Sequence, residues 1–300
     1  MSRDRQLGLR LAILIGLGLS VVTGCAEVAS GLRIPTTAPS GGLEQIPAYL
    51  VKPEGPGPFP AVVIMHDCSG LGPRSSGAPD RWARQLVSRG YVVLMPDSFT
   101  TRGYPAGVCT DASPRRVDVS PLRRVLDAYA ALAYLRTLPY VDGRRVGIMG
   151  GSHGGTTTLA TVAEPERAPG RRDEARRGGF LAAVSLYPSC ASRLGQWNVT
   201  RQTGMRGPIT EYAGVYAPSS PVLILIGESD DWTPAEPCQR LARTAREAGH
   251  PVEVKVYPGA HHSFDSPYPI RPRVPHQPQL GDRPRGYDGR RSRGLGRQHP

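Results

Sequence analysis

Short apolar runs recur along the middle of the chain, and most of them are continuously hydrophobic instead of alternating with polar residues. They occupy residues 48–51, 61–65, 91–95, 146–149, 181–186, 222–226 and 252–257. Continuous apolar runs of this length are typical of strands that are buried on both faces, as they are inside a parallel sheet. The hydrophobic pattern therefore predicts a central sheet of mostly parallel strands.

Longer stretches with apolar residues at helical spacing lie between several of these runs. They are residues 81–90, residues 120–138 and residues 236–249, and Asp80 is placed to cap the first of them. Strands that alternate with helices form a parallel sheet with helices on both faces, because each crossover must pack against the sheet. The predicted fold class is α/β.

The first 25 residues look like an export signal. Arg3, Arg5 and Arg10 precede the apolar segment "LAILIGLGLSVV", which is too short for a comfortable membrane span. The segment ends in "VTGC", and small residues before a cysteine resemble the lipobox of bacterial lipoproteins, in which that cysteine is lipid-modified. Residues 1–25 are thus the predicted lipoprotein signal peptide of an exported cell-envelope protein, anchored to the membrane by a lipid on Cys25. An ordinary cleaved signal peptide and an uncleaved anchor are the alternatives.

Composition divides the rest of the chain into three parts. Residues 26–45 are rich in Pro, Gly, Ser and Thr and lack periodicity, which predicts a flexible tether. Residues 46–265 contain the predicted strands and helices, interrupted by a charged loop at 163–179. Residues 266–300 hold too much Pro, Gly and Arg to pack, so we expect a disordered tail.

The net charge of +12 changes this picture little. Half of the excess lies in the tail, since residues 271–300 carry eight arginines against Asp282 and Asp288. The sequence has no basic stripe interleaved with aromatic residues, so we expect no nucleic-acid partner. With 300 residues, of which 39% are hydrophobic, the chain can form one large α/β domain with a sizeable core.

Export also changes how the cysteines are counted. Without Cys25, four remain, namely Cys68, Cys109, Cys190 and Cys238. An even number in an oxidising compartment indicates two disulfides, although the residues alone leave three pairings open. Zinc is the rival interpretation, but the close-spaced cysteine pair typical of a zinc site is missing. No metal is expected.

The most specific motif is "GGSHGG" at residues 150–155. Gly150, Ser152 and Gly154 satisfy the pattern G-x-S-x-G directly after a predicted strand and before a helix, which is the context of a nucleophile elbow. At such a sharp turn, side chains in place of the glycines would collide with the neighbouring strand and helix. A glycine-rich turn that binds phosphate is the alternative, but the spacing fits neither a P-loop nor a dinucleotide fingerprint.

Partners for this serine follow at the ends of the later strands. Asp230 and Asp231 come just after one buried run, and His261 and His262 come just after the next. The order serine, acid, histidine is the one expected for a hydrolase triad built on this kind of sheet. We expect Ser152 to attack a carbonyl, a histidine to move its proton, and a carboxylate to orient the imidazole.

The developing oxyanion of such a reaction needs two hydrogen-bond donors. We expect one to be the backbone N–H of His153, directly after the serine. The other is expected in the loop "HDCSGL", as the backbone N–H of Cys68. Asp67 in the same loop and Trp232 are candidates for contact with the substrate or for the cleft wall.

These motifs resemble those of the dienelactone hydrolase branch of the α/β-hydrolases. The resemblance covers roughly residues 46–265 and rests on "HDCSGL", "RGYVVLMPDSFTTRG", "GGSHGG", "GESDDWTP" and "YPGAHHSFD". It implies the α/β-hydrolase fold, with Asp230 as the acid, because Gly227 to Pro234 fits the family pattern G-x-x-D-x-x-x-P. It also implies that His262, the histidine before Ser-Phe, is the base.

Two departures from the family bear on the substrate. The founding enzymes carry a cysteine nucleophile where this chain has Ser152, and they hold a carboxylate-bearing lactone with two arginines. Arg102 could serve as the first arginine, one position displaced, but Ser266 stands at the second place. We therefore do not expect dienelactone itself to be the substrate. Family members also usually end in a further helix, for which the tail shows no pattern.

The assigned fold favours one pattern of disulfides. Cys68 with Cys109, and Cys190 with Cys238, would each lie on neighbouring loops at the same end of the sheet.

The combined prediction is a serine hydrolase that cleaves ester or lactone bonds of small substrates without a metal or an organic cofactor. Two alternatives remain open. One is a peptidase, which uses the same triad. The other is a catalytically silent ligand-binding lipoprotein on a hydrolase scaffold, which the unusual tail suggests.

Overall fold

The computed structural model describes residues 27–29, 31–38, 40–111, 113–163, 178–204 and 207–267. The predicted signal peptide, including Cys25, lies outside these ranges. The predicted tail beyond Pro267 and most of the expected loop at 163–179 also lie outside them.

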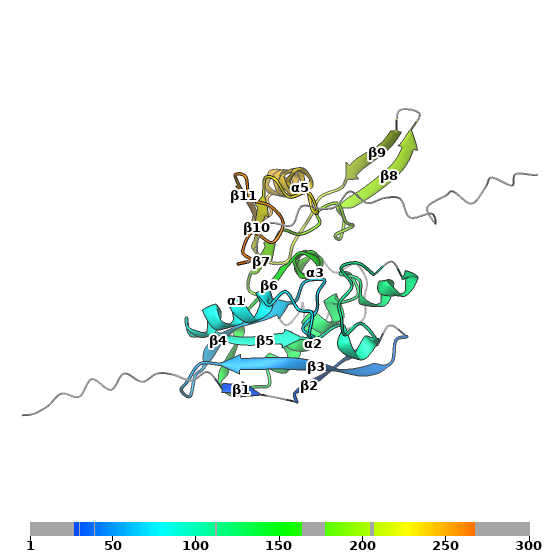
Figure 1. Ribbon diagram of the computed structural model, residues 1–300. Helices are drawn as coiled ribbons and strands as arrows, with labels where there is room; N and C mark the ends of the chain where they lie inside the picture. The colour runs from blue at the N-terminus through cyan, green and yellow to red at the C-terminus, as the bar shows by residue number, and fades with distance from the viewer. Residues whose placement is uncertain are drawn as a thin grey trace, which may run out of the picture.

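A mixed sheet forms the centre of the fold (Figure 1). Its strands follow the order β1-β3-β5-β4-β6-β7-β10-β11, and β2 pairs with the first half of β3. They are β1 (Glu27–Ala29), β2 (Arg33–Thr37), β3 (Leu43–Lys52), β4 (Phe59–Met65), β5 (Val92–Pro96), β6 (Val141–Gly151), β7 (Ala183–Leu186), β10 (Val222–Gly227) and β11 (Val252–Tyr257). From β5 to β11 every neighbouring pair is parallel, whereas β1, β2 and β5 pair with β3 antiparallel. The mostly parallel α/β sheet predicted from the apolar runs is confirmed.

Helices cover both faces of this sheet. They are α1 (Ala78–Val87), α2 (Val125–Leu135), α3 (His153–Val162) and α5 (Ala235–Glu247). Helices α2, α3 and α5 share one buried cluster with Val63 and Met65 of β4. Helix α1 shares the other cluster with Val62 and Ile64 of the same strand. Successive strand residues face opposite sides, so burial on both faces explains why the central strands are continuously apolar.

Two helices begin at other residues than predicted. Helix α1 begins at Ala78, with Gly77 as its N-cap at a φ of 69°. Asp80 is therefore not the cap. It lies in the first turn, where its negative charge interacts favourably with the positive end of the helix dipole. Helix α2 begins at Val125, after a short 3-10 helix at Pro114–Val119 and a run of turns. Within the described ranges, no helix is long and apolar enough to cross a membrane.

The tether predicted for residues 26–45 is wrong for the part next to the domain. Strand β2 pairs antiparallel with β3, so that Ile34 lies opposite Ile46, and both side chains are fully buried. In the same strand, the Thr36 hydroxyl donates a hydrogen bond of 3.0 Å to the buried Asp127. Alternate residues of β2 face the core, a pattern too short and too rich in Pro and Thr to stand out in the sequence.

A hairpin that the sequence did not predict follows β7. It consists of β8 (Asn198–Gly204) and β9 (Gly207–Ala213), and it extends away from the central sheet (Figure 1). At its base the ring of Trp197 stacks on Tyr212 with centroids 5.4 Å apart. The fully buried Trp197 thus joins the hairpin to the domain.

Both expected disulfides are present. Cys68 joins Cys109 with a Cα–Cα distance of 4.8 Å, and Cys190 joins Cys238 with a Cα–Cα distance of 5.0 Å. The first ties the loop after β4 to the segment after β5. The second ties the segment after β7 to helix α5. The pairing favoured by the fold is confirmed.

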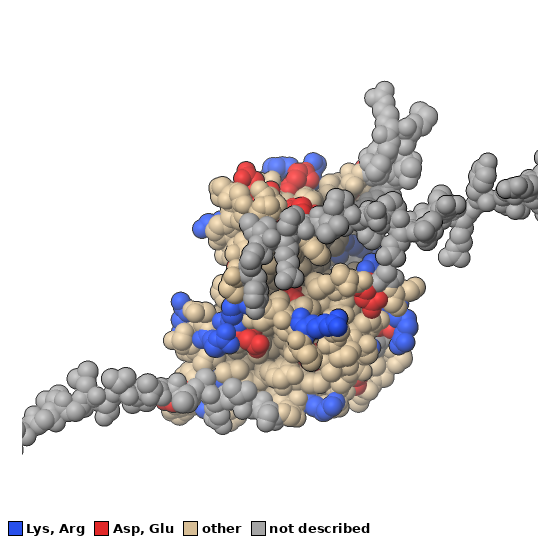
Figure 2. All heavy atoms as spheres, viewed as in Figure 1, with Lys and Arg blue, Asp and Glu red and all other residues tan. Residues whose placement is uncertain are grey.

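Charged side chains of both signs share the face shown in Figure 2, where Asp and Glu lie among Lys and Arg. The described side chains on this face therefore do not form a patch of a single sign. That no nucleic acid binds stays a prediction.

Candidate active site

Ser152 lies at the sharp turn between β6 and α3. Its φ of 54° is unusual for a residue with a side chain and marks the strained turn of a nucleophile elbow. A Cβ on Gly154 would lie 1.9 Å from the carbonyl oxygen of Met65, and one on Gly150 would lie 2.6 Å from the carbonyl of Gly154. Because these spaces are closed, only glycine lets helix α3 begin directly against the end of β4.

Ser152, His262 and Asp230 form a continuous chain of hydrogen bonds. The Ser152 Oγ lies 3.0 Å from the His262 Nε2, and the His262 Nδ1 lies 2.8 Å from the Asp230 Oδ2. Asp230 follows β10 and His262 follows β11, so the parallel sheet brings both to the edge where Ser152 stands. With an ionised Asp230, the Nδ1–H donates to the carboxylate and Nε2 accepts from the serine hydroxyl. Of each adjacent pair, the residue that the motif pattern indicated is the one in this hydrogen-bonded chain.

The surroundings of Asp230 keep its carboxyl group ionised. Its side chain accepts hydrogen bonds from the backbone N–H groups of Trp232 (3.0 Å) and Thr233 (2.8 Å), and from the Thr233 hydroxyl (3.0 Å). Burial alone would raise the pKa of Asp230, but the contacts of His262 and Thr233 outweigh it and lower the pKa below its ordinary value. A carboxylate held in this way can stabilise a protonated imidazole.

Asp265 fixes the loop that carries His262. Its Oδ2 accepts a hydrogen bond of 2.7 Å from the Trp82 Nε1 of helix α1, and its Oδ1 accepts one of 2.8 Å from the Tyr187 hydroxyl. The Tyr187 ring also meets the His262 ring edge-on, with centroids 4.9 Å apart. Sequence reasoning gave Asp265 no role, although it ends the motif "YPGAHHSFD"; its partners lie far away in the chain.

Trp232 covers the other side of the imidazole. Its ring stacks on that of His262 with centroids 5.7 Å apart and an interplanar angle of 17°. The side chain is 42% exposed, so one face rests on the histidine while the rest meets solvent. This is the position expected of a cleft wall.

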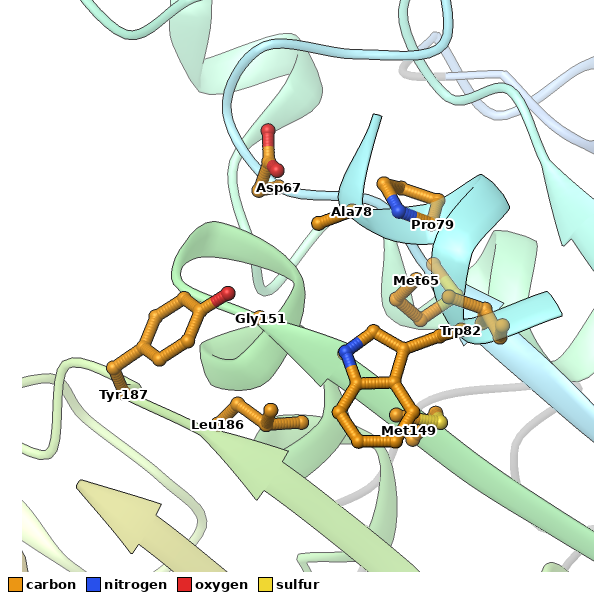
Figure 3. A pocket seen from close by; sticks show the side chains of 11 residues that line it. Met65, Asp67, Ala78, Pro79, Trp82, Met149, Gly151, Leu186 and Tyr187 are labelled. Carbon is orange, nitrogen blue, oxygen red and sulfur yellow. The ribbon is translucent and has the colours of Figure 1, made fainter. Parts of the chain in front are cut away.

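A small pocket lies beside the serine turn (Figure 3). Asp67, Trp82, Gly151 and Tyr187 are among the residues that line it. The Asp67 carboxylate is itself occupied, because one oxygen accepts from the backbone N–H (2.7 Å) and hydroxyl (2.5 Å) of Ser69. The other oxygen accepts a hydrogen bond from the hydroxyl of Ser76 in the same loop. Asp67 thus shapes the pocket wall, and a contact with substrate stays a prediction.

Arg102 does not reach this pocket as a free cation, which corrects the expectation that it binds substrate. Its guanidinium lies 2.9 Å from Glu44 and 2.7 Å from Asp127, and its side chain is only 4% exposed. A further hydrogen bond of 3.1 Å goes to the carbonyl of Ser98. The guanidinium is therefore used within the protein, where it ties β3 to helix α2.

The two predicted oxyanion donors lie on segments that touch. His153 is the first residue of α3, so its N–H is one of the amides at a helix start that have no partner within the helix. The start of α3 packs against the end of β4, as the close approach of Gly154 to Met65 shows. Cys68 follows β4 and is held by its disulfide and by a 2.7 Å hydrogen bond from the Val108 N–H to its carbonyl.

The arrangement suits nucleophilic attack by a serine oxygen on a carbonyl carbon. A largely buried proton acceptor, His262, stands beside the hydroxyl, a fully buried carboxylate stands behind it, and helix-start amides lie next to it. Among the residues that the structure describes, no three His, Cys, Asp or Glu side chains are grouped to hold a metal ion.

Comparison with known proteins identifies relatives that share this architecture. The model of the dienelactone hydrolase family matches residues 46–279. A protein of Methylorubrum extorquens, provisionally named a carboxymethylenebutenolidase, is 27% identical over 230 residues, which are 74% of this chain and 69% of the relative. A solved structure from Klebsiella pneumoniae, provisionally titled a dienelactone hydrolase, has a TM-score of 0.57 at 21% identity and covers 81% of this chain and 89% of its own. Esterase 2 of Thermogutta terrifontis, phosphonylated by cyclosarin, has a TM-score of 0.56 at 23% identity and covers 80% and 84% of the two chains.

Proposed function

Because this chain belongs to the dienelactone hydrolase family of carboxylic ester hydrolases, we propose that it cleaves ester or lactone bonds of small substrates through Ser152, His262 and Asp230. The observation that carries the proposal is the unbroken hydrogen-bonded chain from the Ser152 Oγ to the Asp230 carboxylate. Its three members follow β6, β10 and β11, on the strained turn and the two loops where such chemistry is expected.

The geometry supports a two-step acyl transfer. His262 Nε2 takes the proton of Ser152 as the Oγ–carbon bond forms and the carbonyl electron pair moves onto the oxygen. When the tetrahedral intermediate collapses, the bond to the leaving oxygen breaks and that oxygen receives the proton from His262. Water then repeats the sequence on the acyl-enzyme and releases the acid. Asp230 stabilises the imidazolium in both steps.

The oxyanion of each tetrahedral intermediate would be bound by the backbone N–H groups of His153 and Cys68. Each donor of this kind contributes about a 10²- to 10³-fold factor in kcat. The support is positional, since His153 begins helix α3 and Cys68 lies on the loop packed beside that helix start.

The substrate is proposed to be small and uncharged at the reacting end. Arg102 is bound by Glu44 and Asp127, and Ser266 stands where a second arginine would hold a carboxylate. An apolar wall, Trp232, lies beside His262 instead. These features favour neutral esters and lactones over the carboxylate-bearing lactone of the founding enzymes.

Export and lipid anchoring through Cys25 are proposed as well. The motif "VTGC" supports lipid attachment, and two disulfides fit an oxidising compartment. Mass spectrometry of the mature N-terminus tests this: wild-type protein from the membrane fraction should begin with a lipid-bearing Cys25. A Cys25→Ala variant should lose both the lipid and the membrane association. A mature chain without lipid at that residue would refute it.

The activity is tested by labelling the purified protein with a fluorophosphonate and locating the modified residue by mass spectrometry. Ser152 should be labelled in wild type, and Ser152→Ala and His262→Ala should abolish labelling and lower hydrolysis of p-nitrophenyl acetate by about 10⁴-fold or more. Asp231→Asn is the matched control for Asp230→Asn: only the latter should slow the reaction. A folded wild type that is neither labelled nor active would sink the proposal and favour a silent binding scaffold.

A further inference from the structure

Arg124 is a cation buried where no substrate or solvent reaches it. It precedes helix α2, and none of its surface is exposed. Among the described residues, no carboxylate oxygen lies within hydrogen-bond distance of its guanidinium, and its Nε–H has no acceptor. A hydrocarbon side chain of similar length would fill the same volume without burying a charge. Packing alone therefore does not explain an arginine here.

The guanidinium of Arg124 makes two hydrogen bonds, and each goes to one of the two segments that carry the predicted oxyanion donors. Its Nη1 donates to the His153 Nδ1 over 2.7 Å, and His153 directly follows the serine. Its Nη2 donates to the carbonyl oxygen of His66 over 2.9 Å, two residues before Cys68. One rigid, planar group thus joins the start of helix α3 to the loop after β4.

The charge states of the neighbours fit this bridge. Burial lowers the pKa of Arg124, the charge of Asp127 partly restores it, and the result is about 10, so the side chain is a cation at neutral pH. Burial and the nearby Arg124 hold the pKa of His153 well below its ordinary value. A neutral His153 accepts at Nδ1, as a guanidinium partner requires. The ring of Phe99, 4.9 Å from the guanidinium carbon, adds a favourable aromatic face.

We propose that Arg124 is a positioning residue that sets the distance between the two oxyanion donors, the N–H groups of His153 and Cys68. This inference rests on the proposed hydrolase function. Two amides on separate segments bind one oxygen atom well only if the segments are held to within about half an ångström. The bridge holds one segment at His153 and the other at His66, two residues before Cys68, while the disulfide of Cys68 holds the loop at the donor residue itself.

Loss of the bridge is expected to act on the transition state and to leave substrate binding unchanged. Arg124→Met keeps the length of the side chain and removes both hydrogen bonds. We expect kcat to fall by about 10- to 100-fold while KM stays within about threefold, because misplaced donors weaken only the charge that develops during reaction. Arg123→Met is the matched control: the neighbouring arginine donates to the backbone of Thr37 on the edge strand. It should retain the kcat of wild type.

The experiment measures kcat and KM for p-nitrophenyl acetate, inhibition by an alkyl trifluoromethyl ketone, and melting temperature for each variant. The ketone adds to a serine as a tetrahedral adduct, so its inhibition constant should rise by the same factor by which kcat/KM falls. A merely structural role would lower the amount of folded enzyme, and therefore the apparent kcat at constant KM, but it would leave the inhibition constant of the ketone unchanged. Should Arg124→Met fail to fold, Arg124→Lys decides, since it keeps the charge but cannot reach both acceptors.

The outcomes separate this inference from the proposed function. Wild-type activity that depends on Ser152, together with an unchanged kcat and ketone affinity in a folded Arg124 variant, overturns the positioning role alone. An inactive wild type that no serine reagent labels overturns the hydrolase function, and with it this inference. A lower kcat at constant KM with matching loss of ketone affinity supports both.

Discussion

The two disulfides offer a matched pair of perturbations, because they close loops of similar length but only one holds a predicted oxyanion donor. Cys68→Ala with Cys109→Ala opens a loop of sequence separation 41, and Cys190→Ala with Cys238→Ala opens one of 48. By the chain-entropy relation, each cross-link removes about 13 to 14 cal/mol/K from the unfolded chain. Each double variant should therefore lose about 4 kcal/mol of unfolding free energy at 25 °C.

Activity should separate the two variants. The Cys68 carbonyl accepts the Val108 N–H over 2.7 Å, and a Cβ on Gly107 would lie 2.5 Å from that same oxygen. The segment after β5 thus packs closely on the donor loop, and the disulfide keeps it there. Without it we expect kcat to fall about 10-fold, as a displaced oxyanion donor would cause. The pair between the segment after β7 and helix α5 carries no predicted donor, so its loss should leave kcat unchanged.

Urea unfolding and steady-state kinetics on the same preparations decide the matter. Both variants should unfold at lower urea, with a steeper dependence on urea because the unfolded chain is less compact. Equal kcat values in the two variants would refute the role of the Cys68 disulfide in catalysis. A stability loss under about 1 kcal/mol in both would refute the entropic argument.

Three further outcomes are expected. Because its folded-state pKa lies below the ordinary 3.8, Asp230 adds stability that is complete above about pH 4 and disappears as the pH falls through the lowered pKa. The difference in unfolding free energy between wild type and Asp230→Asn should shrink accordingly in acid, and a pH-independent difference would contradict this. Gly154→Ala, whose Cβ would lie 1.9 Å from the Met65 carbonyl oxygen, should cost about 3 kcal/mol, and an unchanged melting temperature would be incompatible with that contact. Asp265→Asn replaces one accepting oxygen of the carboxylate with an NH₂ group, so one of the hydrogen bonds from Trp82 and Tyr187 is lost. The loop that carries His262 should loosen, and kcat should drop about 10-fold. Wild-type kinetics in this variant would show that other contacts hold the loop.

The residues of the site that could be predicted are those whose position follows from the order and direction of the strands. A parallel sheet collects the carboxyl ends of its strands at one edge, so a serine, an aspartate and a histidine that follow nearby parallel strands are brought to the same edge. The continuous apolar runs located the strands for the same reason, since burial on both faces leaves no room for polar residues. Topology thus narrowed the site to Ser152 and two adjacent pairs, and the family motifs selected Asp230 and His262 from these pairs.

The parts that could not be predicted depend on partners far apart in the chain. Arg102 matched a position in a family motif, yet Glu44 and Asp127 neutralise it, and neither lies near it in sequence. Asp265 meets Tyr187 across 78 positions, and Arg124 meets His66 across 58. No local pattern encodes such contacts, because they depend on where the folded sheet brings the segments. Strand β2 was missed for a related reason, as its alternation becomes meaningful only against β3.

Strand β1 bears on how the proposed lipid anchor would orient the domain. It begins at Glu27, opposite Lys52 at the end of β3, and β3 runs antiparallel to β5. Glu27 therefore lies at the amino ends of the parallel strands, across the sheet from the turn that carries Ser152. A lipid on Cys25 would be two residues away, a span of at most about 8 Å, where a free stretch of twenty residues could reach about 70 Å. The bilayer would then lie under the end of the sheet opposite the serine, and the mouth of the cleft would open toward the aqueous phase. An enzyme held in that orientation would meet water-soluble molecules that diffuse past the membrane, and the lipids beneath it would stay out of its reach.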